Sequence, residues 1–366
     1  MFLLETQQKI LWYQECDFWA KLWKCSDDYG FLKNCHSQIL QQKLKDLDKA
    51  FKEAFDKTQP NKRLPRPKKK GQQDSFRYPQ GFKINGNHIF LPKLGWFKFR
   101  QSRPLQGQPK NVTVSYYCGH WYVSIQTEYE VAQAQHPSTS MIGVDVGIAR
   151  FATLSTGQYF KAKNSFRRCE AQLARAQRSL SRKVKLSNNW KKQKQKIQKL
   201  HAKIARTRQD YLHWCSSHLS KNHAMIVMED LKINAMSRSA KGDLENPGRK
   251  VSAKSGLNKS ILDQGWGEFK RQLSYKSAWL GGEVLLVNPR YTSQTCPDCG
   301  HCAKANRQTQ AHFACVSCGY TDHADVVGAI NVLRAGHAQL AGNGQLACGD
   351  IGSVSFQAQE PLKDAA

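Results

Sequence analysis

The chain has 366 residues, of which 56 are Lys or Arg and 28 are Asp or Glu, so its formal net charge is +28. A hydrophobic fraction of 40% is typical of a folded protein, and no apolar run is long enough to span a membrane. The start, MFLLETQQKI, has no signal-peptide cleavage site, so we expect a cytoplasmic, nucleoid-associated protein. The excess of positive charge favours a nucleic acid over a membrane surface as the partner, because no amphipathic anchor is present.

The first 74 residues are predicted to be a helical region that ends in a basic linker. Apolar residues recur at steps of three and four between Leu32 and Phe55, as an amphipathic helix requires. The stretch from Thr58 to Asp74 is rich in Pro, Gly and Lys, which is typical of a linker or a solvated loop.

From residue 75 to 135 the pattern changes to short strands. Segments such as NVTVSYYCG and HWYVSIQTE alternate with period two and are separated by turn residues. Several antiparallel strands of this kind predict a small β-barrel. Its aromatic residues lie among basic ones and could stack on bases, but packing in a core is the preferred interpretation.

A third region, from residue 136, is predicted to begin with strands and to continue with long basic helices. The sequence from Met141 to Phe160 predicts a buried strand, a glycine turn and two further strands. The segment from Asn164 to His218 predicts helices that are interrupted at 186–188. Residues 161–210 carry seventeen Lys or Arg against two acids, and this imbalance favours contact with phosphates over a merely solvated face.

The remaining segments are expected to alternate between strands, a polar loop and helices. Strands are predicted at 224–231 and 282–288, with a mobile loop or lid at 236–260 and a helix at 261–280 between them. A short helix is predicted from Asp325 to Leu333. The Gly- and Ala-rich tail from Arg334 is expected to be unstructured.

Three acids stand at the ends of predicted strands or at a helix start. Asp145 lies in the apolar strand IGVDVG, Glu229 ends the apolar strand MIVME, and Asp325 begins the last helix. A buried carboxylate is costly unless it is paired or binds a metal, and a helix start favours an anion. We expect the three to meet at the carboxyl edge of one sheet and to hold two Mg²⁺ or Mn²⁺ ions that cleave phosphodiesters.

Each of these acids taken alone is more often structural than functional. Their joint occurrence in a chain of charge +28 is what favours a nuclease site. The neighbouring acids Asp230 and Asp322 are interpreted as structural, and Asp322 could cap the same helix as Asp325.

Two CxxC pairs predict one structural zinc site. Fifteen residues separate the pairs, and the expected ligands are Cys296, Cys299, Cys315 and Cys318. A redox CxxC motif would not explain a second pair, and His301 or Cys302 could replace one ligand. The other cysteines are expected to be free thiols: Cys16, Cys25, Cys35, Cys118, Cys169, Cys215, Cys302 and Cys348.

The motifs around these residues resemble those of the transposon-encoded OrfB/TnpB family, which is ancestral to the type V CRISPR effectors. The motifs are GVDVGIARFATLS, IVMEDLKINAM, and TCPDCGH followed by FACVSCGYTDHADVVGAINVL. SQILQQKLKDLDKAFKEAF and RYPQG in the N-terminal part are also similar to the family. The resemblance extends from about Glu5 to Gly336.

The resemblance implies an α/β fold with helical and β-barrel parts, in which an RNase H-like (RuvC) nuclease domain is interrupted by a zinc ribbon. The expected divisions are a helical recognition lobe at 1–74, an OB-like wedge barrel at 75–135, the nuclease domain at 136–290 and 322–336, the zinc ribbon at 291–321 and a disordered tail at 337–366. The family usually begins with a short basic strand ahead of the region at Glu5. This chain is expected to start after that strand, so the barrel is expected to lack one strand.

The resemblance also implies Mg²⁺-dependent cleavage of double-stranded DNA next to a short transposon-adjacent motif, directed by a guide RNA from the transposon end. Asp145, Glu229 and Asp325 match the family's catalytic carboxylates by position, and the four cysteines match its zinc ligands. No membrane partner and no small-molecule substrate is expected. The alternatives are a non-cleaving RNA-guided DNA-binding protein, such as a repressor or an inactive remnant, and a transposase that acts on its own element ends.

Three residues near Asp325 depart from the family pattern. Val327 and Gly328 stand where the family usually has Asn and then Ala, and His323 stands where Arg is frequent. We expect any defect in cleavage to originate in the part of the site around Asp325.

Overall fold

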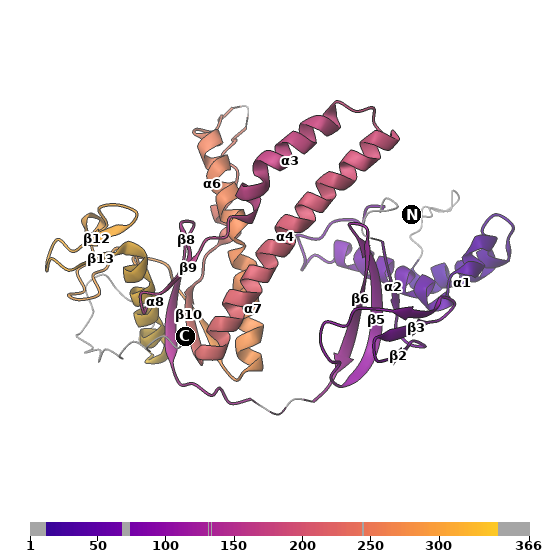
Figure 1. Ribbon diagram of the computed structural model, residues 1–366, viewed down its shortest axis with the longest axis horizontal. Coiled ribbons are helices and arrows are strands. Elements are labelled where there is room, and N and C mark those ends of the chain that lie inside the picture. The colour runs from indigo at the N-terminus through magenta and orange to yellow at the C-terminus, as the bar shows by residue number, and fades with distance from the viewer. Residues whose placement is uncertain (1–11, 68–73, 131, 133, 244, 343–366) are drawn as a thin grey trace. The chain divides into compact units, whose positions relative to one another are not determined.

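A computed structural model of the chain describes residues 12–67, 74–130, 132, 134–243 and 245–342 (Figure 1). The chain divides into two compact units, residues 1–132 and 133–366, and each has its own hydrophobic core. Among the described helices, none combines the length and the apolar character that a membrane crossing requires. The carboxylates and CxxC pairs that the sequence singles out all lie in the second unit.

The first unit combines helices with two small antiparallel sheets. Its helices are α1 (Tyr13–Cys25), the 3₁₀ helix η1 (Gly30–Asn34) and α2 (Ser37–Phe55). One sheet has the order β1-β5-β6, with β1 (Ser75–Tyr78), β5 (Gln108–Tyr117) and β6 (His120–Glu128). The other has the order β2-β3-β4, with β2 (Lys83–Asn85), β3 (His88–Leu91) and β4 (Gly95–Lys98).

The strands of the first unit lie where the alternation predicts them, but the described strands pair as two three-stranded sheets rather than as one closed barrel. Strands β2, β3 and β4 are three or four residues long and pair with one another in antiparallel fashion. Ile89 and Val112, from different sheets, are buried in one core, and the Tyr78 hydroxyl donates to the Pro92 carbonyl at 2.9 Å. The strand expected to be missing ahead of Glu5 concerns residues outside the described part.

The second unit is built on a five-stranded sheet with the order β11-β10-β7-β8-β9. Strands β7 (Met141–Val146), β10 (Met225–Glu229) and β11 (Glu283–Val287) are parallel, whereas β8 (Arg150–Leu154) and β9 (Tyr159–Lys161) extend the sheet in antiparallel fashion. All five lie where the sequence predicts strands, except that β9 extends one residue beyond the predicted end, to Lys161. The carboxyl ends of the three parallel strands meet at one edge of the sheet, where α/β folds place ligands.

Helices cover both faces of this sheet. On one face, apolar residues of α4 (Asn188–Asn222), α6 (Val251–Gln264) and α7 (Trp266–Trp279) form a core with Ile142 and Val144. On the other face, Val332 of α8 (Ala324–Leu340) packs with Val227 and Val287. Helix α3 (Ser165–Ser181) forms a long hairpin with α4, and α5 (Ile233–Met236) is a single turn (Figure 1).

The predicted break between the basic helices is confirmed. Helix α3 ends at Ser181 and α4 begins at Asn188. Leu186 adopts a left-handed conformation with φ of 71°, and the Ser187 side chain caps α4 by accepting the backbone N–H of Trp190 at 3.2 Å.

Three other predictions, one of a loop and two of helices, are wrong in their bounds. The polar segment 236–260 is not a loop throughout, because α6 already begins at residue 251. The helix predicted at 261–280 is divided between α6 and α7 at Gly265, whose φ is +73°. Helix α8 continues past residue 333 to 340, since Gly336 lets it lie against Val227, where a Cβ would come within 2.7 Å. The tail at 343–366 lies outside the described residues.

Candidate carboxylate and metal sites

The register of the parallel strands brings Asp145 and Glu229 to the same level of the sheet. Val144 of β7 is paired with Met228 of β10, so the next residue on each strand is a carboxylate. Side chains alternate between faces, and the Gly143 backbone lies against α8. Asp145 therefore faces α8, and a Cβ on Gly328 of that helix would come within 3.0 Å of its Oδ2 atom.

Asp325 reaches the same place from the first turn of α8, one turn before Gly328. His323 precedes the helix, and its Nδ1 atom accepts the backbone N–H of Asp325 at 3.2 Å. The same nitrogen lies 3.8 Å from Asp325 Oδ2. His323 thus works as the cap of α8, a role that the Arg frequent in the family could not take, since a guanidinium has no acceptor.

Asp145 lies close enough to Glu229 and Asp325 for the charges of both to act on it. Burial raises the pKa of Asp145 well above its ordinary value, and repulsion from Glu229 and Asp325 raises it further, while Arg307 opposes the rise. Burial also raises the pKa of Glu229, against a hydrogen bond from Thr292 and the charge of Arg307. Such a set of oxygen ligands, held together against mutual repulsion, suits a hard divalent cation.

Two residues at this site, Thr292 and Arg307, are absent from the sequence-based prediction. The Thr292 hydroxyl donates to Glu229 Oε1 at 2.6 Å, and Thr292 is only 6% exposed. Both residues lie in polar segments, one just before the first CxxC pair and one between the pairs. No periodicity or spacing marks them, because the fold alone brings these segments to the sheet edge.

The neighbouring acids Asp230 and Asp322 have structural contacts, as the sequence predicted, but the side chain that caps α8 is that of His323 and not that of Asp322. Hydrogen bonds from Lys232 and Lys270 lower the pKa of Asp230 to about 2. Asp322 accepts the Tyr320 hydroxyl at 3.1 Å and the backbone N–H of His323 at 2.6 Å.

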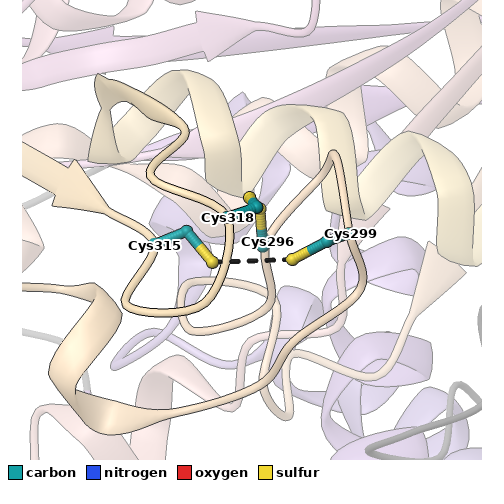
Figure 2. Close-up of side chains that lie close together, drawn as sticks. All are labelled: Cys296, Cys299, Cys315 and Cys318. Atoms are coloured by element: carbon teal, nitrogen blue, oxygen red, sulfur yellow. Dashed lines mark hydrogen bonds between the residues drawn. The ribbon is translucent and has the colours of Figure 1, made fainter.

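The four cysteines of the CxxC pairs form a compact cluster (Figure 2). The Cys296 and Cys318 sulfurs are 3.6 Å apart, those of Cys299 and Cys315 are 3.5 Å apart, and all four lie within 4.8 Å of one another. A tetrahedral zinc ion with Zn–S bonds of about 2.3 Å requires sulfurs about 3.8 Å apart, so the cluster can hold a metal such as zinc.

Local backbone geometry prepares the cysteine cluster for a metal. Gly300 and Gly319, one after each pair, adopt φ of 76° and 78°, which lets the chain turn back at each knuckle. Burial raises the pKa of the Cys296 thiol to about 12, whereas at Cys315 backbone N–H groups of Cys318 and Ser317 outweigh burial and lower the pKa to about 6. Within the described part of the chain, this is the one group of three or more such ligands tight enough for a single ion, and His301 and Cys302 are outside it. The three carboxylates are not grouped as tightly.

The cysteine segment is itself small and irregular. It contains a single 3₁₀ turn, η2 (Lys304–Asn306), and a two-stranded sheet of β12 (His312–Ala314) and β13 (Thr321–His323). Its core consists of Cys296, Cys315 and Phe313, packed on Ala324 and Val327 of α8.

Comparison with known proteins decides the family. A family model described as "Probable transposase" (OrfB) matches residues 124–240, and one described as "Cas12f1-like, TNB domain" matches residues 266–332. The chain is 55% identical to "Putative RNA-guided DNA endonuclease InsQ" of Escherichia coli (strain K12) over 98% of its own length and 87% of that protein. The chain belongs to the OrfB/TnpB family.

More distant similarities are also found. A protein of Streptomyces pristinaespiralis named "Putative RNA-guided DNA endonuclease" is 32% identical over 90% of this chain and 77% of that protein. A solved complex of Cas12f1 with its guide RNA and target DNA covers 81% of this chain and 70% of that protein, with 15% identity and a TM-score of 0.47.

The departures from the OrfB/TnpB pattern have different surroundings in the structure. Val327 is fully buried in the core beside the cysteines, so its side chain belongs to the packing of α8. Gly328 instead faces the Asp145 carboxylate, where the family's usual Ala would add a methyl group within 3.0 Å of Oδ2.

Proposed function

We propose that this chain is an RNA-guided, Mg²⁺-dependent DNA endonuclease with a RuvC-type site formed by Asp145, Glu229 and Asp325. The observation that carries the proposal is the juxtaposition of Asp145 and Glu229 at the ends of neighbouring parallel strands, with Asp325 on α8 close enough for its charge to act on Asp145. The names of the two relatives reported above support the same function, since each contains the words "Putative RNA-guided DNA endonuclease".

Divalent ions at these carboxylates would activate the attacking water and stabilise the leaving oxygen of a phosphodiester. The residues of the chain perform the remaining tasks. Asp145 and Glu229 supply anionic oxygens from a rigid sheet, and Asp325 supplies one from a capped helix start. Thr292 holds the Glu229 carboxylate, and the positive charge of Arg307 near Asp145 and Glu229 is suited to a phosphate.

The cysteine cluster is proposed to bind one structural zinc ion. Four thiolates fill a tetrahedral shell, so no coordination position remains for a substrate. The cluster packs on the start of α8, and the metal would therefore stabilise the helix that carries Asp325.

The proposed partners are a guide RNA transcribed from the transposon end and a double-stranded target DNA beside a short adjacent motif. Base pairing with the guide would select the target, while the protein would contact phosphates. Helices α3 and α4 support this part of the proposal, because residues 161–210, which include all of α3 and most of α4, carry seventeen basic residues against two acids.

Reconstitution with the element's end RNA tests the proposal. The target is a duplex library in which the bases next to a fixed target are randomised, so that the adjacent motif emerges from the cleaved molecules. The wild-type protein is expected to cut both strands with Mg²⁺, and Asp145→Ala and Glu229→Gln to bind the target but leave it uncut. Asp230→Asn is the matched control at the next strand-end acid and should cut normally. The absence of cleavage by the wild type, or full cleavage by Asp145→Ala, would contradict the proposal.

The atypical Gly328 at the carboxylate site favours a second candidate, a non-cleaving RNA-guided DNA-binding protein. That function predicts target binding without cleavage at every Mg²⁺ or Mn²⁺ concentration. The description "Probable transposase" of the matching family model makes strand transfer on the element's own ends a third activity to assay in parallel.

A further inference from the structure

We propose that Thr292 is a positioning residue for Glu229, and that segment 292–296 links the cysteine cluster mechanically to the carboxylate site. The inference rests on the proposed function, in which Glu229 is a metal ligand. It concerns a connection between two sites that the family's motifs treat as separate, a set of strand-end acids and a set of cysteines.

The link begins at the Thr292 hydroxyl. It lies 2.6 Å from Glu229 Oε1 and 3.1 Å from the Pro289 carbonyl oxygen. A hydroxyl has one hydrogen to donate, and the shorter contact to an ionised carboxylate is the stronger of the two. Because Thr292 is almost completely buried, water does not compete readily for this bond.

Two buried asparagines hold the segment that carries Thr292. Asn331 of α8 is 2% exposed, and its Nδ2 atom donates to the carbonyl oxygens of Thr292 and Thr295, both at 2.7 Å. Asn306 is fully buried, and its Nδ2 atom donates to the carbonyl oxygens of Gln294 and His301, both at 2.9 Å. Each amide group thus uses both of its N–H bonds on backbone around the first CxxC pair.

The second asparagine extends the link to the other knuckle. Asn306 Oδ1 accepts the backbone N–H of Val316, which lies between Cys315 and Cys318. Cys296 is itself the last residue of segment 292–296, directly after Thr295, whose carbonyl oxygen Asn331 holds. A metal ion that joins the four sulfurs would therefore hold Thr292 in place, through a chain of buried hydrogen bonds that ends on Glu229.

The consequence for Glu229 is a loss of side-chain freedom. A glutamate at the end of a strand has three rotatable bonds, and its last torsion is broad. When Oε1 is held by Thr292, that torsion is restricted and the direction of the other oxygen is fixed. Residues that orient a metal ligand in this way typically contribute about 10- to 100-fold to metal affinity or activity.

The test compares Thr292→Val, which keeps the shape and removes the donor, with Thr292→Ser, which keeps the donor. Thr295→Val is the matched control, since the Thr295 hydroxyl bonds only within its own turn, to the Tyr291 carbonyl at 3.0 Å. Three quantities are measured on zinc-loaded protein: Mn²⁺ affinity by calorimetry without nucleic acid, the Mg²⁺ concentration for half-maximal cleavage, and target affinity.

We expect Thr292→Val to weaken Mn²⁺ binding and to raise the Mg²⁺ requirement by about 10- to 100-fold, with zinc content and target affinity unchanged. Thr292→Ser is expected to restore most of the loss, and Thr295→Val to match the wild type. Wild-type metal affinity in Thr292→Val would overturn the inference, and so would equal defects in the Val and Ser variants, because they would assign the effect to packing.

Two further outcomes are also decisive. If Thr292→Val and Thr292→Ala both lose their zinc or unfold, the hydroxyl maintains the fold rather than the ligand geometry, and the inference is wrong. If the wild type itself neither binds Mn²⁺ at this site nor cleaves, the proposed function fails before the role of Thr292 is reached.

Discussion

The side chain of Asp145 lies in the folded protein under conditions that oppose its charge. Burial, Glu229 and Asp325 all raise its pKa. Burial also disfavours the charged form of Glu229 and raises its pKa. Without divalent ions these acids therefore destabilise the fold at neutral pH. A preorganised functional site commonly lowers the stability of a protein in this way.

Asp145→Asn is therefore expected to stabilise the metal-free protein while abolishing cleavage. Removing a repelled, buried charge should raise the free energy of unfolding by about 1–3 kcal/mol, which corresponds to about 2–4 °C in Tm for each kcal/mol. Thermal unfolding without added Mg²⁺ measures the effect. Asp230→Asn is the control and should not stabilise, because Asp230 is paired with Lys270 at 2.9 Å. A lower Tm for Asp145→Asn would contradict the prediction.

The raised pKa of Asp145 also predicts how stability depends on pH. Folding favours the protonated carboxyl, so its stabilising contribution is complete below the ordinary pKa of 3.8 and is lost as the pH rises through the raised value. The stability advantage of Asp145→Asn should therefore be absent near pH 4 and grow toward neutral pH. Denaturant unfolding across this range measures it, and saturating Mg²⁺ should reduce the difference. A stability difference between Asp145→Asn and the wild type that does not change with pH would show that the charge of Asp145 does not cause it.

At the scale of elements, α8 decides how the carboxylates meet. Three glycines set its approach to the sheet: Gly143 on β7, and Gly328 and Gly336 on the helix. A Cβ at Gly143 would lie 2.2 Å from the Ala329 carbonyl oxygen, which excludes any larger residue without a shift of the helix. The helix is thus held close enough for Asp325 to act on Asp145.

Gly328→Ala and Gly336→Ala should have opposite effects on stability. Ala is favoured over Gly inside a helix by about 0.5–1 kcal/mol, and at Gly328 the new methyl meets only the end of a carboxylate side chain. At Gly336 it would lie 2.7 and 2.8 Å from the Val227 methyl groups, and overpacking of this kind costs about 1–3 kcal/mol. Chemical denaturation measures both variants. Equal destabilisation by the two variants would contradict the prediction, because it would mean that the Asp145 side chain cannot shift to make room for the methyl group.

At the scale of the whole molecule, the charge of +28 is its most general property. The basic segment is carried by α3 and α4, and Lys192, Lys196 and Lys199 are exposed on the latter at helical spacing. In the first unit, by contrast, Lys43, Lys49 and Lys52 on α2 are paired with acids at 3.4, 3.8 and 2.8 Å.

Replacing Lys192, Lys196 and Lys199 by Gln should weaken nucleic-acid binding and lower its salt dependence. Each lost phosphate contact reduces the slope of log K against log salt by about 0.7–0.9, so three contacts reduce it by about 2–3. Titration of guide RNA and of duplex DNA at several salt concentrations measures the slope. The same change at Lys43, Lys49 and Lys52 is the control for net charge, and an equal reduction by both sets would remove any special role of α4.

The sequence by itself determined those features that depend on neighbours along the chain. The carboxylates stand out because Asp145 and Glu229 interrupt or end apolar strands, and the cysteine cluster stands out because its ligand spacing is local to each knuckle. The break between α3 and α4 was predictable for the same reason, since Ser187 caps the next helix with its own side chain.

Only the tertiary structure decided the features whose partners are distant in the sequence. The start of α6 is polar and has little apolar periodicity, but Lys254 and Asn258 donate to the carbonyl oxygens of Met236 and Ser237, and Lys259 pairs with Glu170 of α3. Thr292 meets Glu229 across 63 positions. Such contacts leave no pattern in the nearby sequence. Each residue is suited to a partner that is distant along the chain, and only folding brings the two together.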